Sequence, residues 1–133
     1  MIGAIIITHG KLAEAIVSTA EAIAGRLENV RHISIDACDS AKCIGDSISS
    51  AIKTMDKKDG IIILTDMFGG TPSNIGLSFL EPGKVEILTG VNLPMLLKFA
   101  GHRADKGLLE LAALLKEHGQ KSIVLASEVL KRK

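Results

Sequence analysis

Two runs of aliphatic residues constrain the fold of this chain more than any other feature. Residues 2–8 read Ile-Gly-Ala-Ile-Ile-Ile-Thr without a charge, and residues 61–64 read Ile-Ile-Ile-Leu. Strands that are apolar along their whole length, and not only at alternate positions, are typical of a parallel sheet that is covered on both faces. We therefore expect both runs to be strands of such a sheet.

Helical and strand-like patterns alternate along the rest of the chain. Apolar residues recur at helical spacing after the first run, and Gly25 suits the left-handed backbone position that ends a helix. The predicted strands cover residues 2–8, 30–35, 61–64, 85–88 and 122–125, and the predicted helices cover residues 12–23, 40–55, 72–80, 93–100 and 106–118. The expected fold is one α/β domain over residues 1–133. It is a doubly wound, mostly parallel open sheet of order 2-1-3-4 with a C-terminal edge strand and helices on both faces.

The composition argues against several classes of function. The 133 residues include 16 Lys and Arg against 15 Asp and Glu, and only 2% are aromatic. A net charge of +1 gives no electrostatic basis for binding nucleic acid, and three Phe offer no platform for stacking bases. No apolar stretch approaches the roughly 20 residues of a membrane helix, and the start lacks a basic leader. We expect no nucleic-acid partner, no insertion into a membrane and a cytoplasmic location.

Neither the cysteines nor the carboxylates predict a metal site. Cys38 and Cys43 lie five residues apart without the further ligands that tetrahedral zinc needs, so we expect two reduced thiols. A receiver-type magnesium site needs an acidic pair after the first strand, where this chain has residues 8–10, Thr-His-Gly. The sequence therefore predicts neither a metal ion nor a cofactor.

Polar residues at the ends of two predicted strands indicate where the chemistry lies. In open sheets of this kind, ligands bind beyond the carboxyl ends of the strands, where the winding reverses. His9 follows the first strand and Asp66 follows the third. In the order 2-1-3-4 these strands are neighbours about 4.8 Å apart, so the two side chains emerge together. A carboxylate beside an imidazole fixes its tautomer and leaves the other ring nitrogen free as a nucleophile or base.

A glycine loop after Asp66 predicts an anion site. Gly69 and Gly70 precede Thr71, which has the character of a helix N-cap and is followed by a proline. Glycines let the backbone present N–H groups without obstruction, and a helix N-terminus is positively polarised, so this loop suits a phosphate group. The helix that begins just after His9 adds a second positive helix end.

The other histidines and the two apolar residues after Asp66 are less informative. His32, His102 and His118 lack a comparable setting, and we expect them to be surface or packing residues. Met67 and Phe68 either tuck into the core or form an apolar docking spot for a partner beside the site. Both interpretations stay open.

Missing motifs argue against other phosphate and hydrolase chemistries. The chain has no GxxxxGK[ST] loop, no GxGxxG after its first strand and no GxSxG elbow. What remains is metal-free transfer of a phosphoryl group to and from an imidazole. In such a reaction, positioning and oriented dipoles supply the catalysis.

Three segments that follow successive strands match one known pattern in order and spacing. They are residues 8–10 (THG), residues 66–74 (DMFGGTPSN) and residues 90–96 (GVNLPML). The chain thereby resembles the mannose-family (mannose/fructose/sorbose) IIA component of the bacterial phosphoenolpyruvate-dependent phosphotransferase system. The resemblance implies that His9 accepts a phosphoryl group from the carrier HPr, forms a phosphohistidine and passes the group to a IIB component for sugar uptake.

The same resemblance assigns roles to other residues and implies an assembly. Asp66 would orient His9, while Gly69, Gly70 and Thr71 would hold the phosphate. The family is homodimeric, and a C-terminal edge strand can be exchanged between its subunits. Phe68 stands where the family often has Trp, a change that bears on partner docking. Because the chain ends at Lys133, we expect the IIB acceptor to be a separate protein.

Other functions stay open at the level of sequence. The same residues suit a regulatory module whose phosphorylation state gates binding to another protein without sugar transport. A related branch supplies phosphoryl groups to dihydroxyacetone kinases, but it typically has Gly-Ser in place of Gly69 and Gly70. A small-ligand domain without phosphoryl chemistry would need a pocket lined by more than one short polar loop. Neighbouring genes for IIB, IIC and IID components would favour transport.

Overall fold

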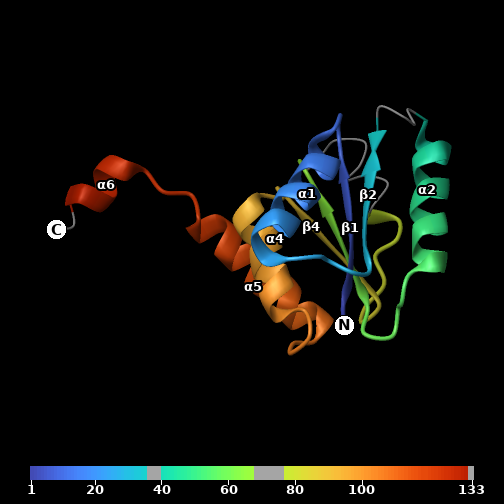
Figure 1. The fold of residues 1–133 in the computed structure, drawn as a ribbon. Coiled ribbons are helices and arrows are strands. Elements are labelled where there is room, and N and C mark those ends of the chain that lie inside the picture. The colour runs from blue at the N-terminus through green and yellow to red at the C-terminus, as the bar shows by residue number, and fades with distance from the viewer. Residues whose placement is uncertain (36–39, 68–76, 132–133) are drawn as a thin grey trace.

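A computed structural model describes residues 1–35, 40–67 and 77–131 (Figure 1). Its elements alternate along the chain, as the apolar patterns predict. The strands are β1 (Gly3–Thr8), β2 (Val30–Ser34), β3 (Ile61–Thr65) and β4 (Val85–Thr89), and the helices are α1 (Leu12–Ala24), α2 (Ala41–Thr54), α4 (Leu93–His102), α5 (Leu108–Lys121) and α6 (Ala126–Lys131). Most of the predicted helix over 72–80 lies outside the described residues. In the parts of the chain that the structure describes, no helix is long and apolar enough to cross a bilayer.

The sheet is parallel and has the order β2-β1-β3-β4, which confirms the predicted topology. The two aliphatic runs form its middle strands, and every residue of β1 and β3 is buried. The outer strands β2 and β4 are partly exposed. The continuous apolar runs therefore mark the strands that are covered on both faces.

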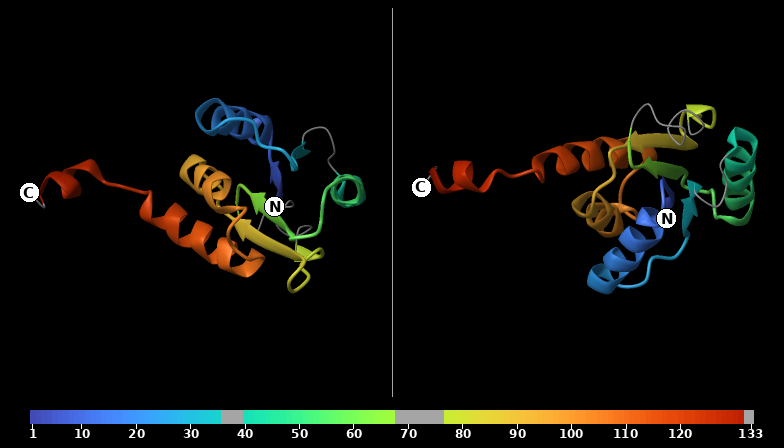
Figure 2. Two further views of the ribbon diagram at one scale, coloured as in Figure 1. Left: turned by 60° about the horizontal axis from the view of Figure 1, so that its bottom comes forward. Right: turned by 90° about the horizontal axis from the view of Figure 1, so that it is seen from above.

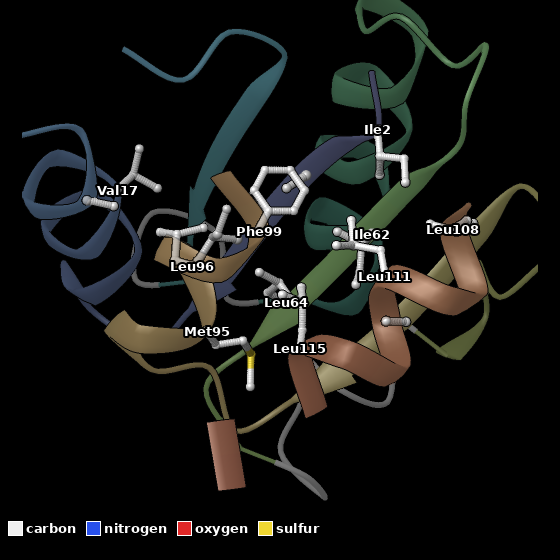
Figure 3. Close-up of a cluster of buried hydrophobic side chains, with 14 of the residues drawn as sticks. Ile2, Val17, Ile62, Leu64, Met95, Leu96, Phe99, Leu108, Leu111 and Leu115 are labelled. Carbon is white, nitrogen blue, oxygen red and sulfur yellow. The ribbon is translucent and has the colours of Figure 1, made fainter. Parts of the chain in front are cut away.

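Helices cover both faces of the sheet (Figure 1). Because successive strand residues point to opposite faces, β1 contributes to two separate cores. Ile6 packs with the buried residues of α1, α4 and α5, including Phe99 and Leu115 (Figure 3). Ile5 and Ile7 pack on the other face against Ile44 and Ile48 of α2. The two cores hold the carboxyl ends of β1 and β3 rigidly between them.

Side-chain caps begin two of the helices. Ser40 accepts a hydrogen bond from the Cys43 N–H at 3.1 Å and caps α2. Asn92 accepts from the Met95 N–H at 2.9 Å and caps α4. Such caps satisfy backbone donors that have no partner inside the helix.

The helix α5 continues past the glycine at which the sequence predicted its end. Gly119 lies within α5 and is buried, and the Asn92 side chain donates to its carbonyl at 3.3 Å. A Cβ at this position would lie 2.8 Å from the terminal methyl of Met95. The glycine therefore serves the close approach of α5 to the start of α4 and does not end the helix.

The predicted C-terminal edge strand over 122–125 is absent from the sheet, which has four strands within the described residues. Residues 123–125 instead lead away from the domain to the short helix α6, which lies apart from the body of the protein in every view (Figures 1 and 2). Ile123, Val124 and Leu125 are all largely exposed. A strand requires a neighbour to pair with, and residues 122–125 pair with no strand in the described part of the chain.

The cysteine chemistry also differs from the sequence expectation. Cys43 is disulfide-bonded, so the expectation of a reduced thiol is wrong for this residue. Cys38 lies outside the described residues. The spacing of the cysteines argued against a zinc site. Whether a disulfide forms depends on how closely the backbone brings two thiols together, and the spacing alone does not show this. Within the described ranges, no three His, Cys, Asp or Glu side chains gather in a group that could hold a metal ion.

Candidate active site

The start of α1 places His9 at the carboxyl edge of the sheet. Thr8 is the last residue of β1 and is fully buried, and its hydroxyl accepts a hydrogen bond from the Ala13 N–H at 2.7 Å. Gly10 has a φ of 58°, a left-handed conformation that glycine adopts readily, and turns the chain from strand to helix. His9 is thus held between a buried strand and a capped helix.

The sheet register brings Asp66 to His9. Ile7 pairs with Thr65, so Asp66 follows β3 at the level where the chain leaves β1. One carboxylate oxygen, Oδ2, lies 2.9 Å from the His9 Nδ1 and also accepts the His9 backbone N–H at 3.0 Å. The structure therefore brings together the two residues that the sequence placed beside each other at the switch point.

Electrostatics favour the ionised form of Asp66. Burial by itself would raise the pKa of this carboxyl, because it disfavours the charged form. The hydrogen bonds from the His9 ring and backbone N–H, together with the charge of the ring, outweigh burial and hold the pKa of Asp66 below its ordinary value. Asp66 is therefore a carboxylate at neutral pH and acts only as an acceptor.

An acceptor at Nδ1 decides the tautomer of His9. Because the carboxylate can only accept, the proton between the two groups sits on Nδ1, and Nε2 carries a lone pair. The His9 side chain is 49% exposed, whereas that of Asp66 is 15% exposed. The ring is accessible and the carboxylate is shielded. Such an arrangement would suit a nucleophilic imidazole that meets its substrate at the surface.

Not every predicted site residue falls within the described structure. Phe68, Gly69, Gly70 and Thr71, and hence the predicted phosphate loop, lie outside it. Met67 is described and is 52% exposed, so it does not tuck into the core. Leu12, in the first turn of α1, is an exposed apolar side chain that the sequence interpretation did not single out.

The remaining histidines have different surroundings. His32 lies on the exposed part of β2, and His118 lies in the last turn of α5. His102 does have a carboxylate nearby, since its Nδ1 lies 3.6 Å from Asp105 Oδ1, but this separation is too long for a hydrogen bond. His9 is the histidine that combines a hydrogen-bonded carboxylate with the start of a long helix.

Two hydroxyl contacts at the turn were not predicted. The Thr8 hydroxyl caps the first turn of α1, and the Ser34 hydroxyl donates to the Gly10 carbonyl at 2.6 Å. Ser34 is the last residue of β2, and only the strand register shows that it faces the turn after β1. The one feature of the sequence that pointed to Ser34 was its position, as a small polar residue near the carboxyl end of the predicted strand over 30–35.

The pKa of Asp66 tests this electrostatic balance. His9→Ala removes the ring hydrogen bond and charge but leaves burial, so the pKa of Asp66 should rise from its wild-type value. A carboxyl ¹³C titration by NMR measures both values. Asp59, whose pKa is lowered mainly by its hydrogen bond with the N-terminal ammonium group, is the internal control and should not change.

The contact between His9 and Asp66 should also affect how the free energy of unfolding depends on pH. A carboxyl whose pKa is lowered in the folded state stabilises the fold at pH values above its pKa in the unfolded chain, here near 3.8. This contribution is lost as the pH falls through the pKa of the folded state. The stability advantage of the wild type over His9→Ala should therefore shrink below about pH 3.8. An unchanged Asp66 titration in the variant would contradict the assigned contact.

Comparison with known proteins shows the family to which this chain belongs. A family model described as "PTS system fructose IIA component" matches residues 3–116. The "PTS system fructose-specific EIIA component" of Bacillus subtilis (strain 168) is 30% identical over 133 residues, which cover 99% of this chain and 91% of that protein. The "PTS system mannose-specific EIIAB component" of Escherichia coli (strain K12) is 32% identical over 124 residues, 92% of this chain. The match spans only 38% of that longer protein.

Solved structures agree in fold. The EIIA phosphotransferase component from Streptococcus agalactiae superposes with a TM-score of 0.86 at 29% identity, covering 96% of this chain and 99% of that one. The mannose/sorbose-specific IIA subunit from Enterococcus faecalis superposes with a TM-score of 0.79 over 92% of each chain, and at 24% identity it shows the shared fold alone. Together with the match over residues 3–116, these relatives show that the chain belongs to the mannose-family EIIA components of the sugar phosphotransferase system.

Proposed function

We propose that this protein is a cytoplasmic phosphocarrier that takes a phosphoryl group from phosphorylated HPr on His9 and passes it to a IIB component for sugar uptake. The observation that carries the proposal is the contact of Asp66 Oδ2 with both the Nδ1 and the backbone N–H of His9. It leaves the Nε2 lone pair outside this contact, on a side chain that is 49% exposed. Membership of the EIIA family supports the same role.

The transfer step follows from the tautomer. The Nε2 lone pair attacks the phosphorus of the donor phosphohistidine, and the donor P–N bond breaks with its electron pair returning to the donor nitrogen. His9 keeps its proton on Nδ1, so the phosphorylated ring carries a positive charge. Asp66 faces that charge at 2.9 Å and stabilises it. Transfer to the IIB component is the same exchange in the opposite direction.

We propose that the transferred group is held by backbone donors without a metal ion. One carboxylate oxygen of Asp66, Oδ2, is engaged by both the ring and the backbone N–H of His9. The N-terminus of α1 begins three residues after His9, and within the described residues the Lys11 N–H at its N-cap has no acceptor. Gly69, Gly70 and Thr71 are the proposed second set of donors, on the evidence of their sequence pattern.

Apolar residues on both segments of the site suit the docking of protein partners. Met67 directly follows Asp66, and Leu12 opens α1 three residues after His9; both are about half exposed. Exposed apolar side chains beside a reactive group mark a surface that is covered during transfer. We propose that Met67, Phe68 and Leu12 contact HPr and the IIB component in turn.

The role of His9 as the phosphoryl acceptor predicts a simple labelling result. Incubation with phosphoenolpyruvate, enzyme I and HPr should add one acid-labile, alkali-stable phosphate to the wild type and none to His9→Ala. His102→Ala is the matched control, because His102 also has a carboxylate within 4 Å, and it should be labelled like the wild type. Mass spectrometry of the intact protein measures the stoichiometry. Full labelling of His9→Ala would overturn the proposed acceptor.

We further propose that the protein is a homodimer in which the C-terminal segment of each chain packs on its partner. Ile123 is 81% exposed and Leu125 is 62% exposed, and the segment projects away from its own domain (Figure 2). Within the described residues, the outer side of β4 has no neighbouring strand. The exposed apolar segment of one chain can therefore pack against the open strand edge of a second chain, and the reverse contact forms at the same time.

Sedimentation tests the dimer at micromolar concentration. The wild type should have a mass of about 28 kDa, twice the chain mass of 14.0 kDa, and the double variant Ile123→Asp/Leu125→Asp should be monomeric. Leu109→Asp is the control, because Leu109 is also largely exposed but lies at the other end of α5. A monomeric wild type, or a double variant that stays dimeric, would contradict the proposed interface.

A further inference from the structure

Two strands flank β1 and each sends a polar side chain to the turn that carries His9. On one side, Thr8 pairs with Ser34 of β2, and on the other, Ile7 pairs with Thr65 at the end of β3. Asp66 binds the His9 backbone N–H from the β3 side. The Ser34 hydroxyl donates to the Gly10 carbonyl from the β2 side at 2.6 Å, in a partly buried contact.

The Ser34 contact sets the direction of the next peptide N–H. The chain has no cis peptide bond among its described residues, and in a planar trans peptide the C=O and N–H point in opposite directions. The Gly10 carbonyl points toward β2, so the Lys11 N–H points away from β2. Since β2 and β3 lie on opposite sides of β1, this N–H is directed to the side on which Asp66 meets His9.

The Lys11 N–H is also available for a ligand. Lys11 is the N-cap residue of α1, and no acceptor is found for its N–H in the part of the chain that the structure describes. The first N–H groups of a helix carry partial positive charge and bind anions well. Gly10, with its φ of 58°, is free to rotate unless something fixes its carbonyl.

We propose that Ser34 is a positioning residue for phosphoryl transfer. By holding the Gly10 carbonyl, its hydroxyl keeps the Lys11 N–H aimed at the phosphoryl group on His9, where it donates a hydrogen bond as the group arrives. The inference rests on the proposed acceptor role of His9. Donors that are oriented before the reaction stabilise the transferred charge without reorganising, so loss of the hydroxyl slows transfer even where the fold is intact.

The test compares Ser34→Ala with Ser34→Thr, which keeps the hydroxyl and suits a strand. The control is Thr54→Val, which removes a hydroxyl that donates to the Ala51 carbonyl at the far end of α2. Rapid-quench phosphorylation from phosphorylated HPr gives kcat and KM. The ¹H–¹⁵N spectrum gives the Lys11 amide shift with and without phosphate on His9.

Ser34→Ala should lower kcat about tenfold and leave KM for phosphorylated HPr unchanged, because the docking surface is intact. Phosphorylation should move the Lys11 amide proton downfield in the wild type and in Ser34→Thr, and clearly less in Ser34→Ala. Thr54→Val should match the wild type in both measurements.

Three results would overturn the proposal: a Ser34→Ala rate equal to wild type, a Lys11 amide that does not respond to phosphate in the wild type, or a Ser34→Thr variant as slow as Ser34→Ala. If the wild type itself takes no phosphate on His9, the proposed function fails and this inference fails with it. If the wild type is labelled normally and one of the three results is found, only the role of Ser34 is lost.

Discussion

The hydrogen bond between Asp66 and His9 is the interaction on which the site depends. It requires the carboxyl ends of β1 and β3 to be adjacent, and the parallel order β2-β1-β3-β4 provides this. The partly buried carboxyl would be harder to ionise without its partner, because burial opposes the charge that the two contacts from His9 restore. Each residue therefore sets the chemical state of the other: His9 keeps Asp66 ionised, and Asp66 holds the His9 proton on Nδ1 and leaves the lone pair on Nε2.

The rest of the fold keeps this pair in place. The buried middle strands end in Thr8 and Thr65, both fully buried, so the residues that follow them start from fixed positions. The more exposed outer strands contribute in other ways: β2 supplies Ser34 to the turn, and the outer side of β4 has no neighbouring strand among the described residues. Rigid interior strands and accessible loops at one edge suit the proposed function, in which one reactive atom is presented to two partners in turn.

Much of this could be predicted from sequence, because the decisive signals are local. Uninterrupted apolar runs identified the middle strands, and the switch in winding placed His9 beside Asp66. The Ser34 contact could not be predicted, since it depends on the register of Thr8 with β2. The apolar run 122–125 was predicted as a strand, but it pairs with no strand in the described part of the chain, and an apolar run alone does not show whether a partner strand is within reach. Likewise, Gly119 suggested a helix end, while close packing on Met95 explains it.

The most direct test of the account is the rate of His9 phosphorylation in Asp66→Asn. An amide keeps the shape of the side chain, but it can offer a donor to the ring and carries no charge to stabilise the phosphorylated imidazolium. Rapid-quench transfer from phosphorylated HPr should slow by about a hundredfold or more, while the variant remains folded like a control variant, Asp105→Asn. Transfer by Asp66→Asn at the wild-type rate would show that Asp66 does not orient His9.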